Sequence, residues 1–223
     1  MMRVLLACVI GLWTSSVLGQ DFIVTDGPLS DDDFYNLVSC EAEPGTDCTF
    51  EPVRWSERDA SDLTVSILDV AESFQHYALA DEALDIAVSE INAAGGSVQL
   101  RRLPDGEEAH VTLYLSGIRE GEPISGIGLR DVDGAILQGA YVHIFWNGAR
   151  ELTRGLIIMA QTLEGFDIQP IILEEVTQSL GLLTDIRNPW YETRSVFSED
   201  SNMVTRLGKQ DAMVIRRHYP ASN

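Results

Sequence analysis

The feature that most constrains the fold is a long amphipathic stretch at residues 74–93 with strand-like segments on both sides. Its apolar residues fall on one broad helical stripe, and Gly95 and Gly96 follow as a helix stop. Residues 63–68 alternate between the two faces of a strand before it, and residues 97–101 resemble a strand after it. A strand, a long helix and further strands together predict a mixed α+β domain.

Three more strands are expected in the second half of the chain. Residues 110–115 alternate in polarity, residues 141–146 are largely apolar, and Asn147 and Gly148 follow as a strong hairpin signal. The run at 155–161 fits either a helix or a strand, and its position after the hairpin favours a strand.

The N-terminus has the pattern of a secretory signal peptide. Arg3 supplies a positive charge, residues 4–13 form an almost unbroken apolar run, and small residues follow at the spacing that signal peptidase requires. We predict cleavage between Gly19 and Gln20, which would place the mature protein in the periplasm or outside the cell. The rival interpretation is a lipoprotein signal around Cys8, but most of the apolar run comes after that cysteine.

Export changes what the cysteines imply. Cys8 is removed with the signal, which leaves Cys40 and Cys48 as an even pair in an oxidising compartment. The turn-rich stretch between them can bring the two sulfurs together, so we predict a disulfide, with two free thiols as the alternative. A short helix is expected just before it, from about residue 30 to 39, with Ser30 in a capping box.

The sequence therefore divides into a signal peptide (1–19), an N-terminal extension (20–54) and one main domain (55–223). The 223 residues, 45% of them hydrophobic, suffice for one sizeable core. The formal net charge of −20 makes the protein acidic and argues against a nucleic-acid partner, because phosphate binding needs a basic surface. No second apolar stretch of about 20 residues follows the signal, so stable membrane insertion is not expected.

A helix near the C-terminus carries the most distinctive polar pattern. It is expected to begin near Pro170, and Gly181 is placed to end it. Glu174 and Gln178 are four residues apart and share one helix face, while Glu175 projects about 100° around the axis.

This segment resembles the extended zinc signature of the metzincin peptidases, H-E-x-x-H-x-x-G-x-x-H-[DS]. Glu174, Gln178 and Thr184 fall on the three zinc-ligand positions, and Glu175 falls on the catalytic glutamate. The segment is still closer to a family of uncharacterised exported bacterial proteins in which E-E-x-x-Q-x-L-G-L replaces the zinc signature.

The resemblance continues beyond the helix. Gly181 falls on the glycine that turns the chain, and Asp185 on an acidic residue that often follows the third ligand. Residues 195–198 look like the methionine turn with Phe197 in place of the methionine, and residues 207–219 resemble the closing helix of matrix-type metzincins. The resemblance implies a zincin-like mixed sheet with a long helix, an active-site-type helix, and an irregular C-terminal subdomain that ends in a helix.

The residue types at the ligand positions predict that zinc chemistry is lost. They offer a carboxylate, an amide and a hydroxyl, whereas zinc strongly prefers imidazole or thiolate. Without zinc there is no acidified water for Glu175 to deprotonate. We therefore expect no cofactor and no metal, with a hard cation on Glu174, Glu175 and Asp185 as the alternative. His110 and His143 are expected to be packed or hydrogen-bonded residues and not ligands.

Three interpretations of the segment remain open. The helix can be a structural relic in which Gln178 forms a hydrogen bond across the former metal site. It can border a groove for an extended peptide or envelope protein, with Glu175, Gln178 and Asp185 as polar groups, because zincin folds present a sheet edge beside this helix. It can also carry metal-free acid–base chemistry on Glu174 and Glu175. We predict an exported pseudo-metallopeptidase with a binding or structural role. The alternative is a hydrolase centred on Glu175 with an unusual metal or none.

Overall fold

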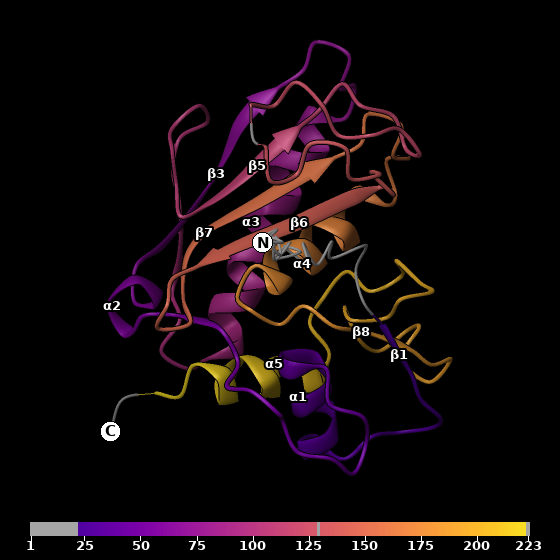
Figure 1. Ribbon diagram of the computed structural model, residues 1–223. Coiled ribbons are helices and arrows are strands. Elements are labelled where there is room, and N and C mark those ends of the chain that lie inside the picture. The colour runs from indigo at the N-terminus through magenta and orange to yellow at the C-terminus, as the bar shows by residue number, and fades with distance from the viewer. Residues whose placement is uncertain (1–21, 129, 222–223) are drawn as a thin grey trace, which may run out of the picture.

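Figure 1 shows the computed structural model, which describes residues 22–128 and 130–221. Within these ranges the chain is a mixed α/β protein with five helices and a mostly parallel main sheet. The predicted signal peptide and Cys8 lie outside the described residues. None of the helices in the described part has the length and apolar character needed to cross a bilayer.

The main sheet has the spatial order β2-β7-β5-β3-β4, and β6 pairs with β7. Its strands are β2 (Arg54–Trp55), β3 (Leu63–Val70), β4 (Leu100–Arg102), β5 (Val111–Leu115), β6 (Ala140–Trp146) and β7 (Glu151–Met159). All neighbours are parallel except β6, which runs antiparallel to β7. Because β2 pairs only with the first two residues of β7, the long edges of the sheet are β4 and β6.

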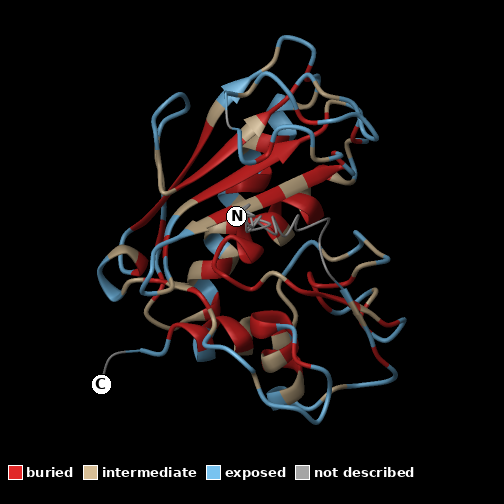
Figure 2. Ribbon diagram, in the orientation of Figure 1, coloured by how far each residue is buried: buried red, intermediate tan, exposed pale blue. Residues whose placement is uncertain are grey.

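Two helices cover one face of this sheet, α3 (Tyr77–Ala94) and α4 (Ile168–Gln178), and they pack against each other (Figure 1). The alternation of β6 follows from this layering. Val142 and Ile144 are buried on the helix-covered face, whereas Tyr141, His143 and Phe145 are half-buried on the opposite face. Figure 2 shows the result as buried strands with exposed loops at the ends of the sheet.

Most expected elements are present with shifted ends. The helix expected at 74–93 begins at Tyr77. Phe74 precedes it in a turn but is still buried, so it continues the apolar stripe. The strand expected at 97–101 begins only at Leu100, where the Asn92 side chain accepts from Leu100 N at 2.7 Å and ties the loop to α3. Residues 155–159 are in a strand, as favoured from the sequence.

The N-terminal extension is an integral part of the fold. β1 (Phe22–Val24) pairs in parallel with β8 (Asp185–Arg187), a strand that the sequence did not reveal. α1 (Asp31–Cys40) begins at the expected cap, where Ser30 Oγ accepts from the backbone N–H of Asp33 at 3.1 Å. The apolar face of α1 is fully buried, so the described part of the extension, residues 22–54, closes the lower side of the core.

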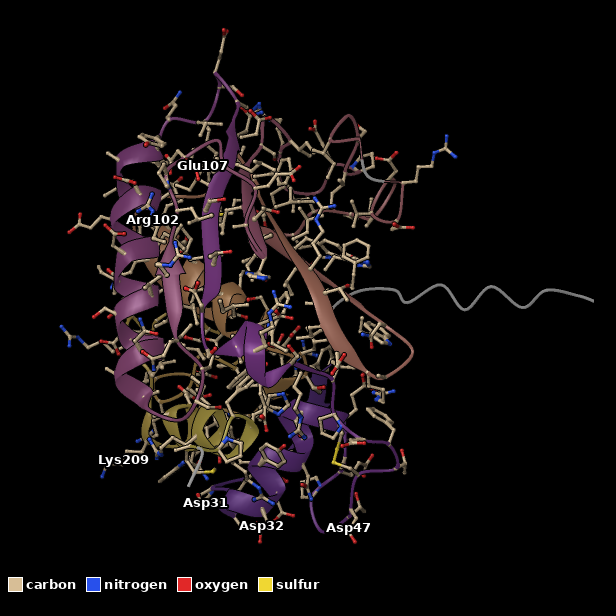
Figure 3. The ribbon with its side chains drawn as sticks, turned by 90° about the vertical axis from the view of Figure 1, so that its left-hand side faces the viewer. Asp31, Asp32, Asp47, Arg102, Glu107 and Lys209 are labelled. Carbon is tan, nitrogen blue, oxygen red and sulfur yellow. A yellow bond between two sulfur atoms is a disulfide. The ribbon has the colours of Figure 1, made fainter. Side chains whose placement is uncertain are left out.

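The remaining elements complete the lower half of the molecule. These are α2 (Glu57–Ala60) and α5 (Lys209–His218), and α5 packs against α1. Cys40 and Cys48 form the predicted disulfide, which Figure 3 shows near Asp47. On the other side of the same view, Arg102 of β4 reaches α3 and pairs with Asp85 at 2.9 Å.

Candidate functional site

The signature-like segment starts on α4, which packs beside β6. Pro170 lies in the first turn, where its missing N–H leaves no hydrogen bond unmade. α4 ends at Gln178, and Gly181 turns the chain with φ +98°. A Cβ at Gly181 would lie 2.2 Å from the carbonyl oxygen of Val53. Glycine is therefore required both by the backbone conformation and by the close approach of the neighbouring chain.

The side-chain amide of Gln178 bridges two elements. Gln178 Nε2 donates to Asp185 Oδ1 at 2.9 Å, from the last residue of α4 to the first residue of β8. Gln178 is fully buried and Asp185 is 1% exposed. The bond therefore ties the C-terminal end of α4 to the start of β8 inside the core.

Thr184 and Phe197 are both covered by α1. The backbone N–H of Thr184 donates to the carbonyl oxygen of Val38 at 3.3 Å. The ring of Phe197 packs against Phe34, with the centroids 6.0 Å apart. Thr184 and Phe197 are both buried. Sequence reasoning had placed nothing over this site, because α1 lies far away along the chain and its contacts leave no local signal.

The turn at 195–198 is held by a carboxylate whose role sequence reasoning missed. Asp211 of α5 accepts hydrogen bonds from Ser195 Oγ at 2.7 Å, from Val196 N at 3.1 Å and from Gly208 N at 2.8 Å. Burial raises the pKa of Asp211 to about 6, and these three bonds oppose the rise because they favour the charged form. The available signal was its place as the third residue of the closing helix, a capping position.

Three carboxyl groups interact electrostatically next to Gln178. They belong to Glu174 and Glu175 on α4 and to Asp185 on β8, and we call them the carboxyl cluster. Burial raises the pKa of Glu175 to about 8. Burial, followed by repulsion from neighbouring carboxylates, raises the pKa values of Glu174 and Asp185 well above their ordinary range. Glu175 is therefore a neutral acid at pH 7.

The carboxyl cluster has an unsatisfied hydrogen-bonding capacity. Glu175 is only 3% exposed, and its Oε2 has no hydrogen-bond partner among the described residues. Ser198 Oγ is also buried and has no hydrogen-bond partner among the described residues. Ser198 forms a parallel β-bridge with Ile186, which directly follows Asp185. Within the described ranges, no ion pair reaches any of the three carboxyl groups.

Arg187, the positively charged residue nearest to Asp185 in the sequence, forms its ion pairs with residues outside the carboxyl cluster. Arg187 of β8 pairs with Glu199 and with Asp200, each at 3.1 Å, and lies over the ring of Phe22 at 3.6 Å. Among residues 22–128 and 130–221, no three His, Cys, Asp or Glu side chains are grouped so that they could hold a metal ion.

The histidines occupy the packed positions expected of them. His110 Nδ1 accepts from the backbone N–H of Thr64 at 3.1 Å. His143 packs edge-on against Phe145 at 4.6 Å between centroids. Neither lies in the signature-like segment.

Two hollows in the described surface lie away from this segment. One of about 280 Å³ is lined by Trp55, Arg150 and Tyr219, among others. The other, of about 410 Å³, lies on the uncovered face of the sheet at His110 and Arg154. No residue from 174 to 185 lines either of these two hollows. Glu175, Gln178, Thr184 and Asp185 are buried where α4, β8 and α1 meet.

Comparison with protein-family models finds none that matches the chain, and comparison with curated proteins finds no match either. The functional assignment therefore depends on the carboxyl cluster, the Gln178–Asp185 hydrogen bond and the neighbouring strand β6.

Proposed function

We propose that this chain is an exported zincin-like domain, related to the metzincins, that binds an extended peptide or envelope protein and does not hydrolyse peptides with zinc. The observation that carries the proposal is the hydrogen bond from Gln178 Nε2 to Asp185 Oδ1, which ties up the second ligand position in the core. The sheet order supports the family assignment, because an antiparallel edge strand, β6, lies beside the helix that bears the signature-like residues.

The free edge of β6 supplies the backbone groups that such a partner needs. Ala160 N donates to Gly139 O at 2.7 Å, which fixes the alternation of hydrogen-bonding pairs along β6 and β7. In that register the N–H and C=O groups of Val142 and Ile144 point away from β7. Among the described strands β6 pairs with β7 alone, so an added strand can pair with these outward groups.

Side chains along β6 offer contacts for alternate residues of a bound peptide. Tyr141 and His143 stack at 6.3 Å, and His143 and Phe145 pack edge-on at 4.6 Å, which makes a continuous aromatic row. The net charge of −20 favours a partner with basic residues, because complementary charge raises the association rate.

Metal analysis of the purified mature protein tests the loss of zinc hydrolysis. We expect less than stoichiometric zinc and no peptidase activity in wild type. Stoichiometric zinc, together with a peptidase activity that is lost in Glu175→Gln, would overturn the proposal.

Strand addition is tested with Val142→Pro and Val142→Ala as a matched pair. Both variants shorten the buried side chain, but only proline removes the outward N–H. Binding to a library of basic decapeptides, read by mass spectrometry, should fall in Val142→Pro and persist in Val142→Ala. Equal retention by both variants contradicts strand addition at β6.

A second candidate is a metal-free hydrolase centred on Glu175. It is favoured by one observation, the unpartnered Oε2 of a buried carboxyl whose pKa is raised to about 8. A group that ionises near neutral pH suits general acid–base catalysis. Hydrolysis of peptide or ester substrates by metal-free wild type, absent in Glu175→Gln, would favour this candidate over the binding role.

A further inference from the structure

The hollow of about 280 Å³ beside β2 is lined by charged side chains of both signs that do not pair with one another. They are two arginines and three glutamates: Arg54, Arg150, Glu51, Glu57 and Glu151. None of the five forms an ion pair with any residue in the described ranges. Opposite charges that surround a hollow without neutralising one another leave room for a charged ligand between them.

Arg54 is half-buried in this hollow, and its guanidinium forms no hydrogen bond with a described residue. Glu151 lies directly opposite Arg54 in the register of β2 and β7, but its Oε2 accepts from Asn147 Nδ2 at 3.0 Å. Arg102 shows the contrast, because three aspartates reach its guanidinium. The N–H donors of Arg54 are therefore available to a ligand.

Arg150 adds a second guanidinium to the same hollow. Its Nε donates to the carbonyl oxygen of Glu51, and its guanidinium lies 5.0 Å from the centre of the Phe50 ring. These contacts fix the side chain and leave its two terminal nitrogens without a carboxylate among the described residues. Arg54 and Arg150 are also joined through the backbone, since Arg54 N donates to Arg150 O at 3.3 Å.

The aromatic wall of the hollow is held in place by hydrogen bonds. Trp55 Nε1 donates to Ser179 O at 3.1 Å, and the hydroxyl of Tyr219 donates to Leu180 O at 2.6 Å. The same hydroxyl accepts from Trp55 N at 3.1 Å. A wall that is already ordered lowers the entropic cost of binding a ligand against it.

The charge of Arg54 is felt at the base of the hollow. Burial lowers the pKa of His218 to about 4, and the positive charge of Arg54 contributes to the decrease. Burial raises the pKa of Tyr219, and Arg54 opposes that rise. Glu51 and Glu57, in contrast, are exposed at the rim. The hollow thus combines a positive group in its interior with negative groups at its mouth.

We propose that this hollow binds a small zwitterion with one carboxylate and one ammonium group, either a free amino acid or a short peptide. The site is separate from β6, so the inference goes beyond the proposed strand addition and does not depend on it. Arg54 and Arg150 hold the carboxylate, and the glutamates at the rim accept from the ammonium group.

The chemistry of the lining favours a ligand of both charges. A guanidinium binds a carboxylate through two parallel hydrogen bonds, and an ammonium group offers three donors to carboxylate oxygens. A ligand with one charge would leave the arginines or the glutamates without a partner. The volume is just below the range of about 300–1,000 Å³ that is usual for ligand sites, so the ligand is small.

Calorimetric titration of the purified exported protein tests the proposal. The probes are the standard amino acids, dipeptides of glycine, alanine and leucine, and each of these with an acetylated amine or an amidated carboxylate. At least one free form should bind with a Kd of about 1 mM or tighter, and both blocked forms of that ligand about tenfold more weakly or worse. Preference for amino acids or for dipeptides identifies the source of the zwitterion.

Arg54→Gln should weaken binding of the best probe by about tenfold or more. Arg58→Gln is the matched control, because Arg58 is exposed on the neighbouring helix α2 and does not line the hollow. The proposal is overturned if no free form binds, if blocked and free forms bind equally, or if the two variants bind alike. The first two outcomes need wild type alone, so they decide the matter even if Arg54→Gln does not fold.

Discussion

Lowering the pH from 7 to 4 should destabilise this protein through one buried histidine. His218 lies near the end of α5 and is fully buried. Its Nε2 donates to the carbonyl oxygen of Val53 at 3.0 Å, so the neutral ring accepts the hydroxyl of Tyr35 at Nδ1, 3.2 Å away. Burial, with a smaller contribution from the charge of Arg54, lowers the pKa of His218 to about 4.

The direction of the stability change depends on whether the folded or the unfolded state protonates His218 at the higher pH. In the unfolded chain the imidazole protonates below its ordinary pKa of 6.5, whereas the folded protein resists protonation of His218 until about pH 4. The stability that the neutral ring contributes is therefore complete above pH 6.5 and is lost as the pH falls toward 4. At about 1.4 kcal/mol per pH unit, the loss amounts to about 3 kcal/mol.

Urea unfolding at pH 7 and pH 4 measures this loss in wild type and in His218→Gln. Glutamine keeps a donor for Val53 but does not titrate, so the variant should lose about 3 kcal/mol less than wild type over this range. Other titrating groups are common to both proteins and cancel in the difference. His76→Gln, at the start of α3, is the matched control for the removal of one histidine. Equal pH dependence in wild type and His218→Gln would refute the reasoning.

Three further predictions address the same lower half of the molecule. Gly181→Ala should cost about 2 kcal/mol or more in urea unfolding, because φ +98° and the approach of Val53 O leave no room for a Cβ. Replacing Cys40 and Cys48 by serine should cost about 2–3 kcal/mol by the same measurement, from the lost constraint on the unfolded chain, and no change would contradict this. Because burial raises the pKa of Glu175 from 4.5 to about 8, wild type should lose stability as the pH rises between these values. Glu175→Gln should gain about 3–5 kcal/mol relative to wild type between pH 5 and pH 9 in thermal or urea unfolding, and a parallel pH profile would exclude ionisation of Glu175.

Local signals in the sequence sufficed for much of the fold. The alternation of residues 63–68 and the helical stripe at 74–93 gave elements of the right type, because the period of an element is set by its own backbone. The Ser30 cap and the turn at Gly181 could be read because each depends on a few neighbouring residues. The disulfide between Cys40 and Cys48 was equally local, since the loop between them is short.

The candidate site could be identified only in part. The sequence placed Glu175, Gln178 and Asp185 in one segment, but the structure identified Asp185 as the hydrogen-bond partner of Gln178. The ends of β4 and α3 were missed, because the Asn92 side chain and the buried Phe74 decide them through contacts with other elements.

The sequence alone determined the order of strands and helices and the absence of histidines from the signature-like segment. Only the tertiary structure revealed that β1 pairs with β8 and that α1 covers Thr184 and Phe197. β8 has three residues and no measurable period, so its existence depends on a partner strand from the opposite end of the chain. The raised pKa values of the carboxyl cluster have the same origin, because they depend on burial by distant segments.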